Sequence, residues 1–242
     1  MDALIYSVMS GAERTLRAEQ VHANNLANSD TGGFQADLET ATSQAVTKGY
    51  GYDARHMSRL VANAVDGRAG IAHETGRDLD ASIAGSGYFA VQAKNGEAYT
   101  RAGNFTLDQD GTLTVGGRPV LGAGGPIVLP TYSSVQIDTD GTISIQAPGQ
   151  SQMQPVDRLK LVKAPASAVV KDPSGLIVAR SGQPLPVDDT VTVHGGHLEG
   201  SNVSAIDEMV STMDLNRDFE IQMKLYTAAD NMASEGNKLV GE

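Results

Sequence analysis

The chain has 242 residues and a formal net charge of −11, from 18 Lys and Arg against 29 Asp and Glu. This charge argues against non-specific nucleic-acid binding, which needs a cationic surface to displace counterions, and against docking on anionic membranes. The absence of cysteine excludes disulfides and thiolate sites. No stretch approaches the ~20 apolar residues of a membrane span, and no basic segment followed by an apolar one marks a cleaved secretory signal.

Residues 3–28 are predicted to form a helix. Apolar side chains recur there with the i, i+4 spacing of one helical face, at Leu4, Val8, Ala12 and Leu16. The following run, 28–33, is rich in Asn, Asp and Gly, which favour turns and left-handed backbone. We therefore expect the helix to end there.

Three asparagines gather at the end of this predicted helix, although Asn is a mediocre helix former. Asn28 is interpreted as a residue that ends the helix. For Asn24 and Asn25 we expect buried or half-buried hydrogen bonds to neighbouring backbone. A polar group at a helical seam fixes the register, because any misaligned pairing leaves it unsatisfied.

Residues 35–76 have weak periodicity and are predicted to form an extended connector that is ordered against a neighbour. Residues 40–46 could instead extend a helix, which the glycines of the run 48–52 would break.

Residues 77–195 are predicted to be all β. The segment 105–115 is echoed by the segment 135–145, since both alternate apolar and polar residues around Asp-x-Asp-Gly-Thr. Alternation on each side of an Asp-Gly turn is a strong hairpin signal. With 27 glycines and 5% aromatic residues, we expect a modest core of Val, Ile, Leu and Ala.

No constellation of residues indicates an enzyme or a metal site. The two Asp-Gly turns carry paired aspartates that could bind calcium, namely Asp108, Asp110, Asp138 and Asp140. Their flanks are predicted strands and no Glu occupies the twelfth position of an EF-hand loop, so a turn-forming role is favoured. His194 and His197 lie close in sequence but lack a third zinc ligand nearby. No phosphate loop, nucleophile elbow or triad pattern is present.

From about residue 201 the helical period returns. Ser201 or Asn202 is predicted to cap this helix, with Asp207 and Glu208 placed to favour its dipole. One apolar stripe consists of Ile206, Met209, Val210 and Met213. A second has coiled-coil-like spacing and consists of Ile221, Leu225, Ala228, Met232, Glu235 and Leu239.

Short motifs at both ends and in the body resemble those of the bacterial flagellar axial proteins, which form the rod and the hook. The motifs are Asn24-Asn25-Leu26-Ala27-Asn28, Thr31-x-Gly33-Phe34, Leu79-Asp80-x-x-Ile83, Tyr99-Thr100-Arg101, Gly125-Pro126-Ile127 and Leu198-Glu199-x-Ser201-Asn202-Val203. Within this family, the start of the chain and the run Arg158–Val162 look most like the proximal rod members. The distal rod member is the alternative.

The resemblance implies an α+β fold, in which N- and C-terminal helices flank a central all-β domain and pack into a helical tube on assembly. The expected parts are an N-terminal axial helix and turn (1–34), an extended connector (35–76), a β-rich body (77–195) and a C-terminal axial helix (196–242).

The resemblance also implies a structural subunit of the proximal rod, not an enzyme, with no cofactor. Such a subunit polymerises through its terminal helices into a periplasm-spanning shaft that transmits torque. Its expected partners are itself, other proximal and distal rod proteins, and the flagellar type III export apparatus, which exports it without signal cleavage. Neither nucleic acid nor membrane insertion is expected. Two rivals are a monomeric β-domain that binds calcium or a glycan, and an enzyme with an unrecognised site.

We expect subunit contacts from the apolar stripes and from the two terminal motifs, and no catalytic, cofactor-binding or metal-binding residues. The predicted interface residues are Leu4, Val8, Ala12, Leu16, Asn24, Asn25, Leu26, Asn28, Phe34, Asn202, Val203, Ile206, Met209, Val210, Met213, Phe219, Ile221, Leu225, Met232 and Leu239.

Overall fold

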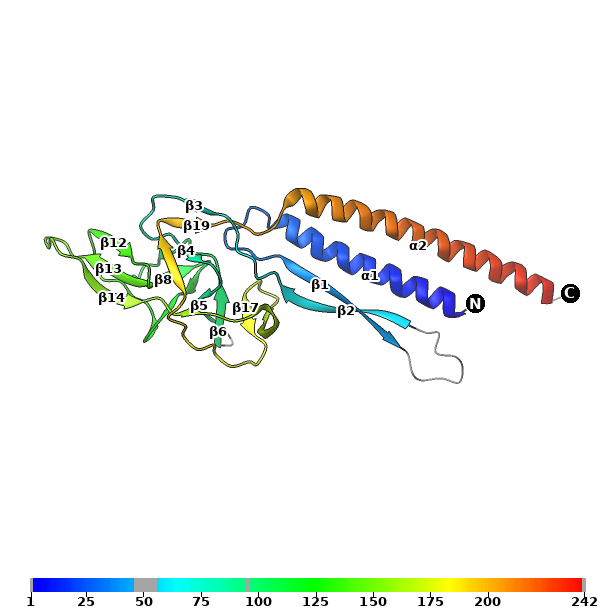
Figure 1. Cartoon of the computed structure of the whole chain (residues 1–242), viewed down its shortest axis with the longest axis horizontal. Coiled ribbons are helices and arrows are strands. Elements are labelled where there is room, and N and C mark those ends of the chain that lie inside the picture. The colour runs from blue at the N-terminus through cyan, green and yellow to red at the C-terminus, as the bar shows by residue number, and fades with distance from the viewer. Residues whose placement is uncertain (1, 46–55, 95, 241–242) are drawn as a thin grey trace. The chain divides into compact units, whose positions relative to one another are not determined.

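The computed structural model describes the backbone of residues 2–45, 56–94 and 96–240, and side chains within 8–38, 64–94, 96–236 and at 238. The predicted break over 48–52 and the side chains of Leu4 and Leu239 lie outside the described residues. The protein is α+β: in sequence order, an N-terminal helix comes first, a β domain follows, and a C-terminal helix ends the chain (Figure 1). Its backbone divides into two compact units, which we call the helical unit and the β unit.

The helical unit comprises Met1–Ala27, Asp37–Asn63 and Ser204–Glu242. It contains the helices α1 (Asp2–Ala27) and α2 (Ala205–Val240), the strand β1 (Asp37–Ala45) and most of the strand β2 (His56–Val65). The two helices lie side by side and run in opposite directions (Figure 1).

The segment 35–76, predicted as an extended connector, contains the strands β1 and β2. β1 and β2 are neighbours in a two-stranded sheet, so the helical alternative for 40–46 is wrong over its described part. β-branched residues such as Thr40 and Thr42 favour extended backbone. The pairing partner lies in the same chain, which weak local periodicity could not reveal.

The β unit comprises Asn28–Ala36 and Ala64–Val203. Its further elements are β3 (Ala72–Glu74), β4 (Ala81–Ala84), β5 (Tyr88–Ala93), β6 (Gly96–Thr100), β7 (Thr106–Leu107), β8 (Leu113–Val115), β9 (Arg118–Pro119), β10 (Leu121–Gly122), β11 (Gly125–Pro126), β12 (Ser134–Ile137), β13 (Thr142–Gln146), β14 (Gln154–Arg158), β15 (Leu161–Val162), the 3-10 turn η1 (Ala166–Ala168), β16 (Val169–Lys171), β17 (Ile177–Ala179), β18 (Thr192–Gly195) and β19 (His197–Glu199).

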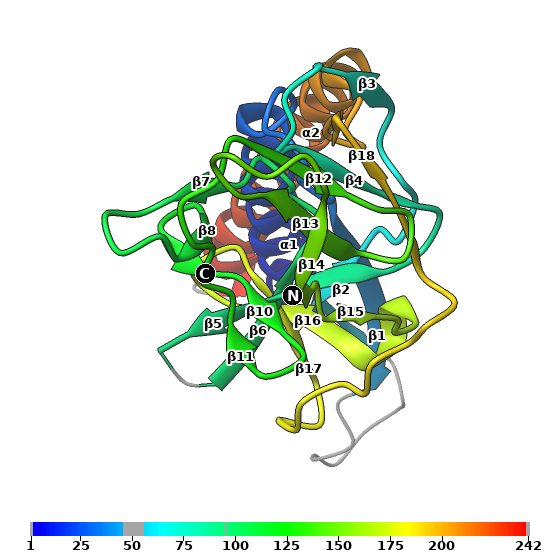
Figure 2. The same cartoon turned by 90° about the vertical axis from the view of Figure 1, so that its left-hand side faces the viewer.

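These short strands form several small antiparallel sheets, seen end-on in Figure 2. The largest has the strand order β15-β5-β6-β17-β16, and two others have the orders β12-β13-β14 and β7-β8-β9. The strands β3 and β4 each pair with one from the end of the β unit, in the sheets β19-β3 and β18-β4. The β unit is therefore closed by strands from both ends of its sequence.

The two predicted Asp-Gly hairpins are confirmed. Leu107 pairs with Leu113 and Ile137 pairs with Ile143 across turns in which Gly111 and Gly141 have φ of 78° and 83°. A third turn of the same kind, which the sequence analysis missed, lies between β16 and β17. There the Asp172 carboxylate accepts hydrogen bonds from the amides of Ser174 and Leu176, and Gly175 has φ of 80°.

The core of the β unit is built mainly from Val, Ile, Leu and Ala, as predicted. Its largest aromatic contact is edge-to-face, between Phe89 and Phe105, whose ring centroids are 5.2 Å apart. A second cluster gathers around the side chains of Tyr88 and Tyr99. Burial of both tyrosines raises the pKa of their hydroxyls above the ordinary value.

One ion pair lies fully inside the β unit. Arg101 and Glu199 are 1% and 4% exposed, and the Arg101 Nε lies 2.8 Å from Glu199 Oε1. The remaining guanidinium nitrogens donate to the carbonyls of Gly85 and Gly87, and the Glu199 carboxylate also accepts from the Gly70 amide. Every strong polar group of the pair is therefore used, which offsets the cost of removing it from water.

The turn that follows α1 contacts the backbone of Glu199 through Gly33. The Gly33 amide donates to the Glu199 carbonyl at 2.8 Å, and its φ is 68°. A Cβ at Gly33 would lie 2.2 Å from the Ala102 amide nitrogen. The terminal motif therefore needs glycine both for its backbone conformation and for this close approach.

Gly33→Ala should destabilise the β unit more than Gly76→Ala. Gly76 has a nearly equal φ of 69°, but nothing lies within 4 Å of the site of its Cβ. We expect Gly76→Ala to cost ~1–2 kcal/mol for left-handed backbone, and Gly33→Ala to cost a further ~1–3 kcal/mol for overpacking. Urea unfolding of both variants measures the difference, and equal losses would contradict the docking of Gly33.

Candidate assembly interface

The two helices pack within the subunit mainly through small and polar side chains. On α1 these recur with the 4-3-4-3 spacing of a coiled-coil seam: Gly11, Thr15, Ala18, His22 and Asn25. On α2 the less exposed residues fit the same spacing except at position 226, which is the exposed Tyr226, and two of them are large and apolar: Leu215, Phe219, Gln222, Ala229, Ala233 and Gly236. We call these two sets the inner seam.

Side-chain hydrogen bonds cross the inner seam at two levels. Gln222 Nε2 donates to Thr15 Oγ1 at 3.2 Å. At the other end of α1, His22 Nδ1 contacts Glu208 Oε2, and Asn25 Nδ2 donates to Glu208 Oε1 at 3.3 Å. Gly11 lies against the Gln222 side chain, where an added Cβ would be 3.4 Å away. The helices therefore recognise each other by polar groups and close approach.

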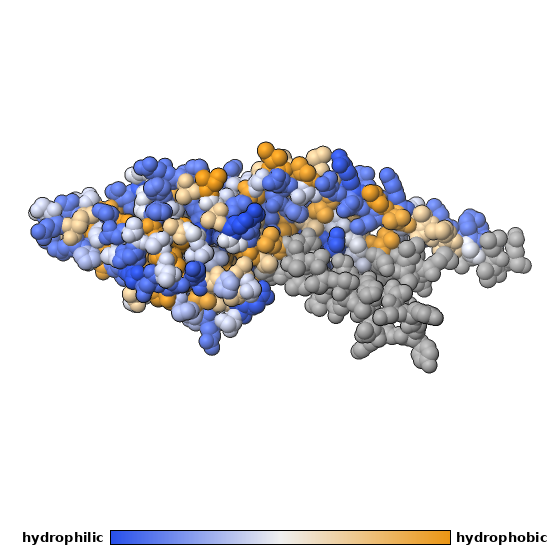
Figure 3. Space-filling view, in the orientation of Figure 1, coloured by the Kyte–Doolittle hydropathy of each residue, from blue (hydrophilic) through white to orange (hydrophobic). Residues whose placement is uncertain are grey.

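Apart from Leu215 and Phe219, the large apolar side chains of the described part of α2 are exposed. Ile206, Met209, Val210 and Met213 have the i, i+3, i+4, i+7 spacing of one face and are 52% to 74% exposed. Further along, Ile221, Leu225 and Met232 are 53% to 58% exposed. We call these seven residues the outer face of α2; Figure 3 shows apolar side chains gathered along the helices.

A second apolar surface lies between the helices at the N-terminal half of α1. Its lining residues are Val8, Met9, Ala12, Leu16, Met223 and Tyr226, together with Ser10 and Glu13. Met9 and Leu16 are 57% and 46% exposed, while Val8 and Ala12 are half-buried. We call this surface the apolar groove. Val8, Ala12 and Leu16 of the predicted α1 stripe thus lie on the groove, and the inner seam is a different set of residues.

The asparagine motif at the end of α1 holds the start of β1. Asn25 exchanges two hydrogen bonds with the backbone of Asp37: Oδ1 accepts from the amide at 2.8 Å, and Nδ2 donates to the carbonyl at 3.1 Å. This confirms the predicted bonds of Asn25 to neighbouring backbone. Asn24 Nδ2 instead donates to the Asp37 carboxylate at 2.9 Å. Asn28 follows the helix, and Thr31 donates to its side chain.

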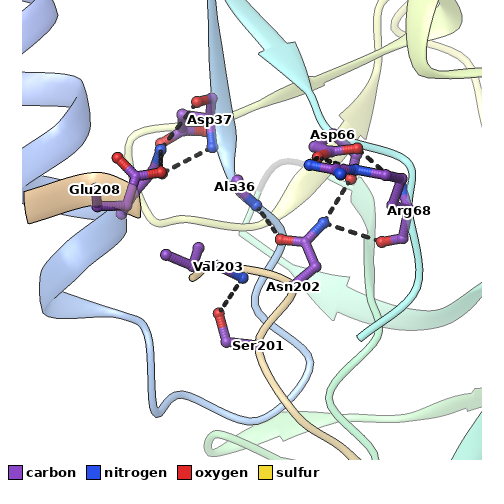
Figure 4. A network of polar contacts seen from close by, with 9 residues as sticks. Ala36, Asp37, Asp66, Arg68, Ser201, Asn202, Val203 and Glu208 are labelled. Atoms are coloured by element: carbon purple, nitrogen blue, oxygen red, sulfur yellow. Dashed lines mark hydrogen bonds and ion pairs between the residues drawn. The ribbon is translucent and has the colours of Figure 1, made fainter. Parts of the chain in front are cut away.

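The C-terminal motif has its own network in the β unit, centred on Asn202 (Figure 4). Asn202 Oδ1 accepts from the Ala36 amide at 2.7 Å, and Nδ2 donates to the carbonyls of Asp66 and Arg68 at 3.1 and 2.9 Å. The Asn202 amide donates to the Phe34 carbonyl at 3.2 Å. One amide side chain thus joins three segments that are far apart in sequence.

The predicted cap of α2 is wrong. Asn202 is used in the network above, and Ser201 Oγ accepts from the Val203 amide. The helix begins at Ala205, and Ser204 Oγ accepts from the Asp207 amide at 3.4 Å. Ser204 therefore holds the N-cap position, and Ser201 and Asn202 precede it in the sequence. Asp207 and Glu208 do lie in the first turn, as predicted.

Phe34 and its neighbour Gln35 are held by Lys171. The Lys171 ammonium lies 3.8 Å from the centroid of the Phe34 ring and donates to the Gln35 carbonyl at 2.5 Å. A cation over an aromatic face is attracted by the ring's quadrupole. Phe34 therefore has a contact within its own chain. Of the other predicted interface residues, Leu26, Val203 and Phe219 are half-buried.

Sequence reasoning missed Ser204, Lys171, the inner seam and the ion pair between Arg101 and Glu199. The seam had a visible signal, because small and polar residues follow a 4-3-4-3 spacing along α1. Arg101 and Glu199 both lie in the quoted motifs, but no pattern in sequence says that they meet.

The paired aspartates act in their own turns. Asp108 Oδ1 accepts from the amides of Asp110 and Thr112, and Asp140 accepts from the amide and hydroxyl of Thr142. No group of three or more His, Cys, Asp or Glu residues suited to a metal occurs within the described part of the chain. Neither described helix offers an apolar run long enough to span a membrane.

Three family models match the chain in order along its length. They are described as Flagella basal body rod protein (residues 5–35), Flagellar hook protein FlgE/F/G D1 domain (residues 82–145) and Flagellar basal body rod FlgEFG protein C-terminal (residues 194–239). The matches include both helices and much of the β unit, so they define a flagellar rod or hook protein.

Comparison with individual relatives shows which member of this class the chain resembles. The flagellar basal-body rod protein FlgF of Escherichia coli (strain K12) is 38% identical over 99% of each chain, and that of Salmonella typhimurium has the same identity and coverage. FlgF of Caulobacter vibrioides is 35% identical over 96% of this chain and 94% of its own. The chain belongs to the flagellar basal-body rod protein FlgF family. It is a structural rod subunit and not an enzyme.

Asn202→Ala should destabilise the β unit because it removes three side-chain hydrogen bonds and leaves the buried Ala36 amide without its acceptor. We expect a loss of ~2–4 kcal/mol of unfolding free energy. Asn104→Ala is the control, since Asn104 is exposed, and should change stability by less than ~0.5 kcal/mol. Denaturant unfolding measures both, and a loss for Asn202→Ala as small as that of the control would contradict the network.

The β unit should lose stability in acid partly through Asp66. Burial alone raises the pKa of Asp66, but hydrogen bonds and charge attraction from Arg68 outweigh it, so the pKa lies below the ordinary value of 3.8. A lowered pKa stabilises the fold above the unfolded value, and this contribution disappears as the pH falls through the folded value. Asp66→Asn should therefore flatten the pH dependence of unfolding below about pH 4. Parallel pH curves for the variant and the parent would contradict this.

Proposed function

We propose that this subunit belongs to the proximal rod and polymerises through the outer face of α2 and the apolar groove. The helical units of neighbouring rod subunits pack into a tube, with the β units outside, and the resulting shaft crosses the periplasm and transmits torque. The observation that carries the proposal is the seven-residue outer face, exposed along a helix whose own partner uses a different seam.

The energetics favour helices of another subunit as the occupant of these surfaces. Burying a Leu, Ile, Val or Met side chain contributes ~1.5–3 kcal/mol, and seven such residues line the outer face alone. Isolated helices are marginal in water without such packing. Ordering each residue costs roughly 1–2 kcal/mol, so repeated apolar contacts along both helices are needed to make a stiff shaft.

The proposal divides the predicted interface residues into two groups. Asn25, Asn202 and Phe34 make contacts within their own chain, so their role is to build the subunit that assembles. The outer-face residues and Val8, Ala12 and Leu16 make the contacts between subunits. The four-part division into 1–34, 35–76, 77–195 and 196–242 is retained only as a description of the sequence.

The likeness to FlgF over the full chain favours the proximal position over the distal one. FlgG of Bacillus subtilis, by comparison, is 35% identical over 46% of this chain. We also propose that the partners include other rod proteins and, during export, the flagellar type III apparatus. A monomeric binding module is not favoured, because the paired aspartates already accept hydrogen bonds within their own turns.

Ile221→Asp should block incorporation into the rod while the β unit stays folded, because it places a carboxylate on the outer face. Ile71→Asp makes the same substitution at an isoleucine of the β unit that is 73% exposed and lies on neither assigned surface, so it is the matched control. Each variant replaces the native protein in a flagellated host lacking its own copy, and isolated basal bodies are then probed for the subunit. We expect loss of subunit and motility for Ile221→Asp alone.

Thermal unfolding of each purified variant checks that the β unit is intact. A motile strain that carries Ile221→Asp would contradict the assigned surface. Equal loss of rod incorporation by Ile221→Asp and by the control variant would contradict it as well.

A further inference from the structure

Methionines are concentrated on the surfaces assigned to assembly. Five of the eight methionines lie on the described parts of α1 and α2, and all five are exposed: Met9 57%, Met209 52%, Met213 58%, Met223 43% and Met232 58%. Met209, Met213 and Met232 belong to the outer face, and Met9 and Met223 line the apolar groove. Both surfaces therefore present thioethers to solvent in the free subunit.

The chain contains no cysteine, so no thiol of its own competes for an oxidant. Oxidation of Met to the sulfoxide converts a flexible apolar side chain into a polar one and disrupts Met-rich interfaces. Met209 and Met213 are i, i+4 neighbours beside Ile206 and Val210, so two sulfoxides there would place polar groups in the middle of the outer face.

We propose that these methionines are modification sites, and that peroxide oxidation of the free subunit blocks its assembly. The assembled rod protects the same side chains, because the neighbouring subunit covers them. Repair by methionine sulfoxide reductases returns the subunit to the assembly-competent form. The inference rests on the proposed function, since it assigns a regulation to the same surfaces.

The oxidant is hydrogen peroxide, and the reaction balances without another reagent. A sulfur lone pair attacks one peroxide oxygen, the O–O bond breaks and an S–O bond forms. The proton on the transferred oxygen passes to the departing hydroxide, which leaves as water. Each thioether loses two electrons and each peroxide gains two. The two reductases, one for each sulfoxide epimer, reverse the change: a dithiol gives up two electrons and becomes a disulfide, and the sulfoxide oxygen leaves as water.

Peroxide footprinting tests protection. Purified full-length protein and isolated basal bodies are treated with hydrogen peroxide, and sulfoxide is read by peptide mass spectrometry. Met153, on the β unit and 40% exposed, is the internal reference. In the free subunit we expect the five helical methionines to oxidise at rates comparable to that of Met153. In basal bodies they should oxidise about tenfold more slowly relative to Met153. Equal relative rates in both samples would overturn the inference.

Paired variants test the consequence for assembly. Met209→Gln with Met213→Gln imitates the polarity of the sulfoxide and should reduce incorporation by about tenfold. Replacement of all five helical methionines by Leu keeps both surfaces apolar, so that variant should assemble normally and continue to do so after peroxide treatment. Met153→Gln is the control and should assemble as the parent does.

The outcomes separate this inference from the proposed function. If the double Gln variant assembles normally while Ile221→Asp does not, the outer face is confirmed and the oxidation inference is wrong. If both assemble normally, the assigned surface itself is wrong. If peroxide blocks assembly of the variant with all five helical methionines replaced by Leu as strongly as that of the parent, oxidation acts elsewhere and the inference fails.

Discussion

The buried ion pair between Arg101 and Glu199 is the interaction on which the architecture of the β unit depends. Its partners come from the middle and the end of that unit, 98 residues apart in sequence. A buried charge costs several kcal/mol unless its partner and its remaining hydrogen-bond sites are satisfied. Here the carbonyls of Gly85 and Gly87 and the amide of Gly70 complete the set. Four segments of the chain must therefore be in place together.

Two glycines make this arrangement possible, because each lies where two backbone segments come very close to each other. Gly33 reaches the Glu199 carbonyl only because no Cβ stands against Ala102, and a Cβ at Gly70 would lie 2.2 Å from the Gly200 carbonyl oxygen. The segments that enter and leave the β unit are thus fastened by backbone contacts. This explains why the terminal motifs combine glycine and asparagine with few large apolar residues.

In the helical unit, the contacts within the subunit and the exposed apolar surfaces use different residues. Contacts within the subunit use polar residues such as Thr15, Gln222 and Glu208, while most of the large apolar side chains remain exposed on other faces. Polar contacts in a seam specify one register, because a shifted pairing leaves groups unsatisfied. Apolar side chains are less selective, and the flexible side chain of Met adapts to irregular partners. A subunit built this way has a defined internal pairing and an adaptable outer surface.

The local elements were predictable from the sequence, because they depend on short-range patterns. The Asp-x-Asp-Gly runs determined two hairpins, since an Asp side chain, Asp108 in one and Asp140 in the other, and the left-handed Gly complete the turn locally. The spacing of Ile206, Met209, Val210 and Met213 determined an apolar helical face. The motifs at the two ends were enough for the family.

Only the tertiary structure decided which of these elements meet. Asn202 joins Ala36 across 166 residues, Lys171 covers Phe34, and β1 pairs with β2 where local periodicity is weak. The helical seam uses Gly11 and Thr15 in place of the more apolar stripe that the sequence emphasised. These outcomes depend on which polar groups can satisfy one another at long range, and a local pattern carries no information about a partner so far along the chain.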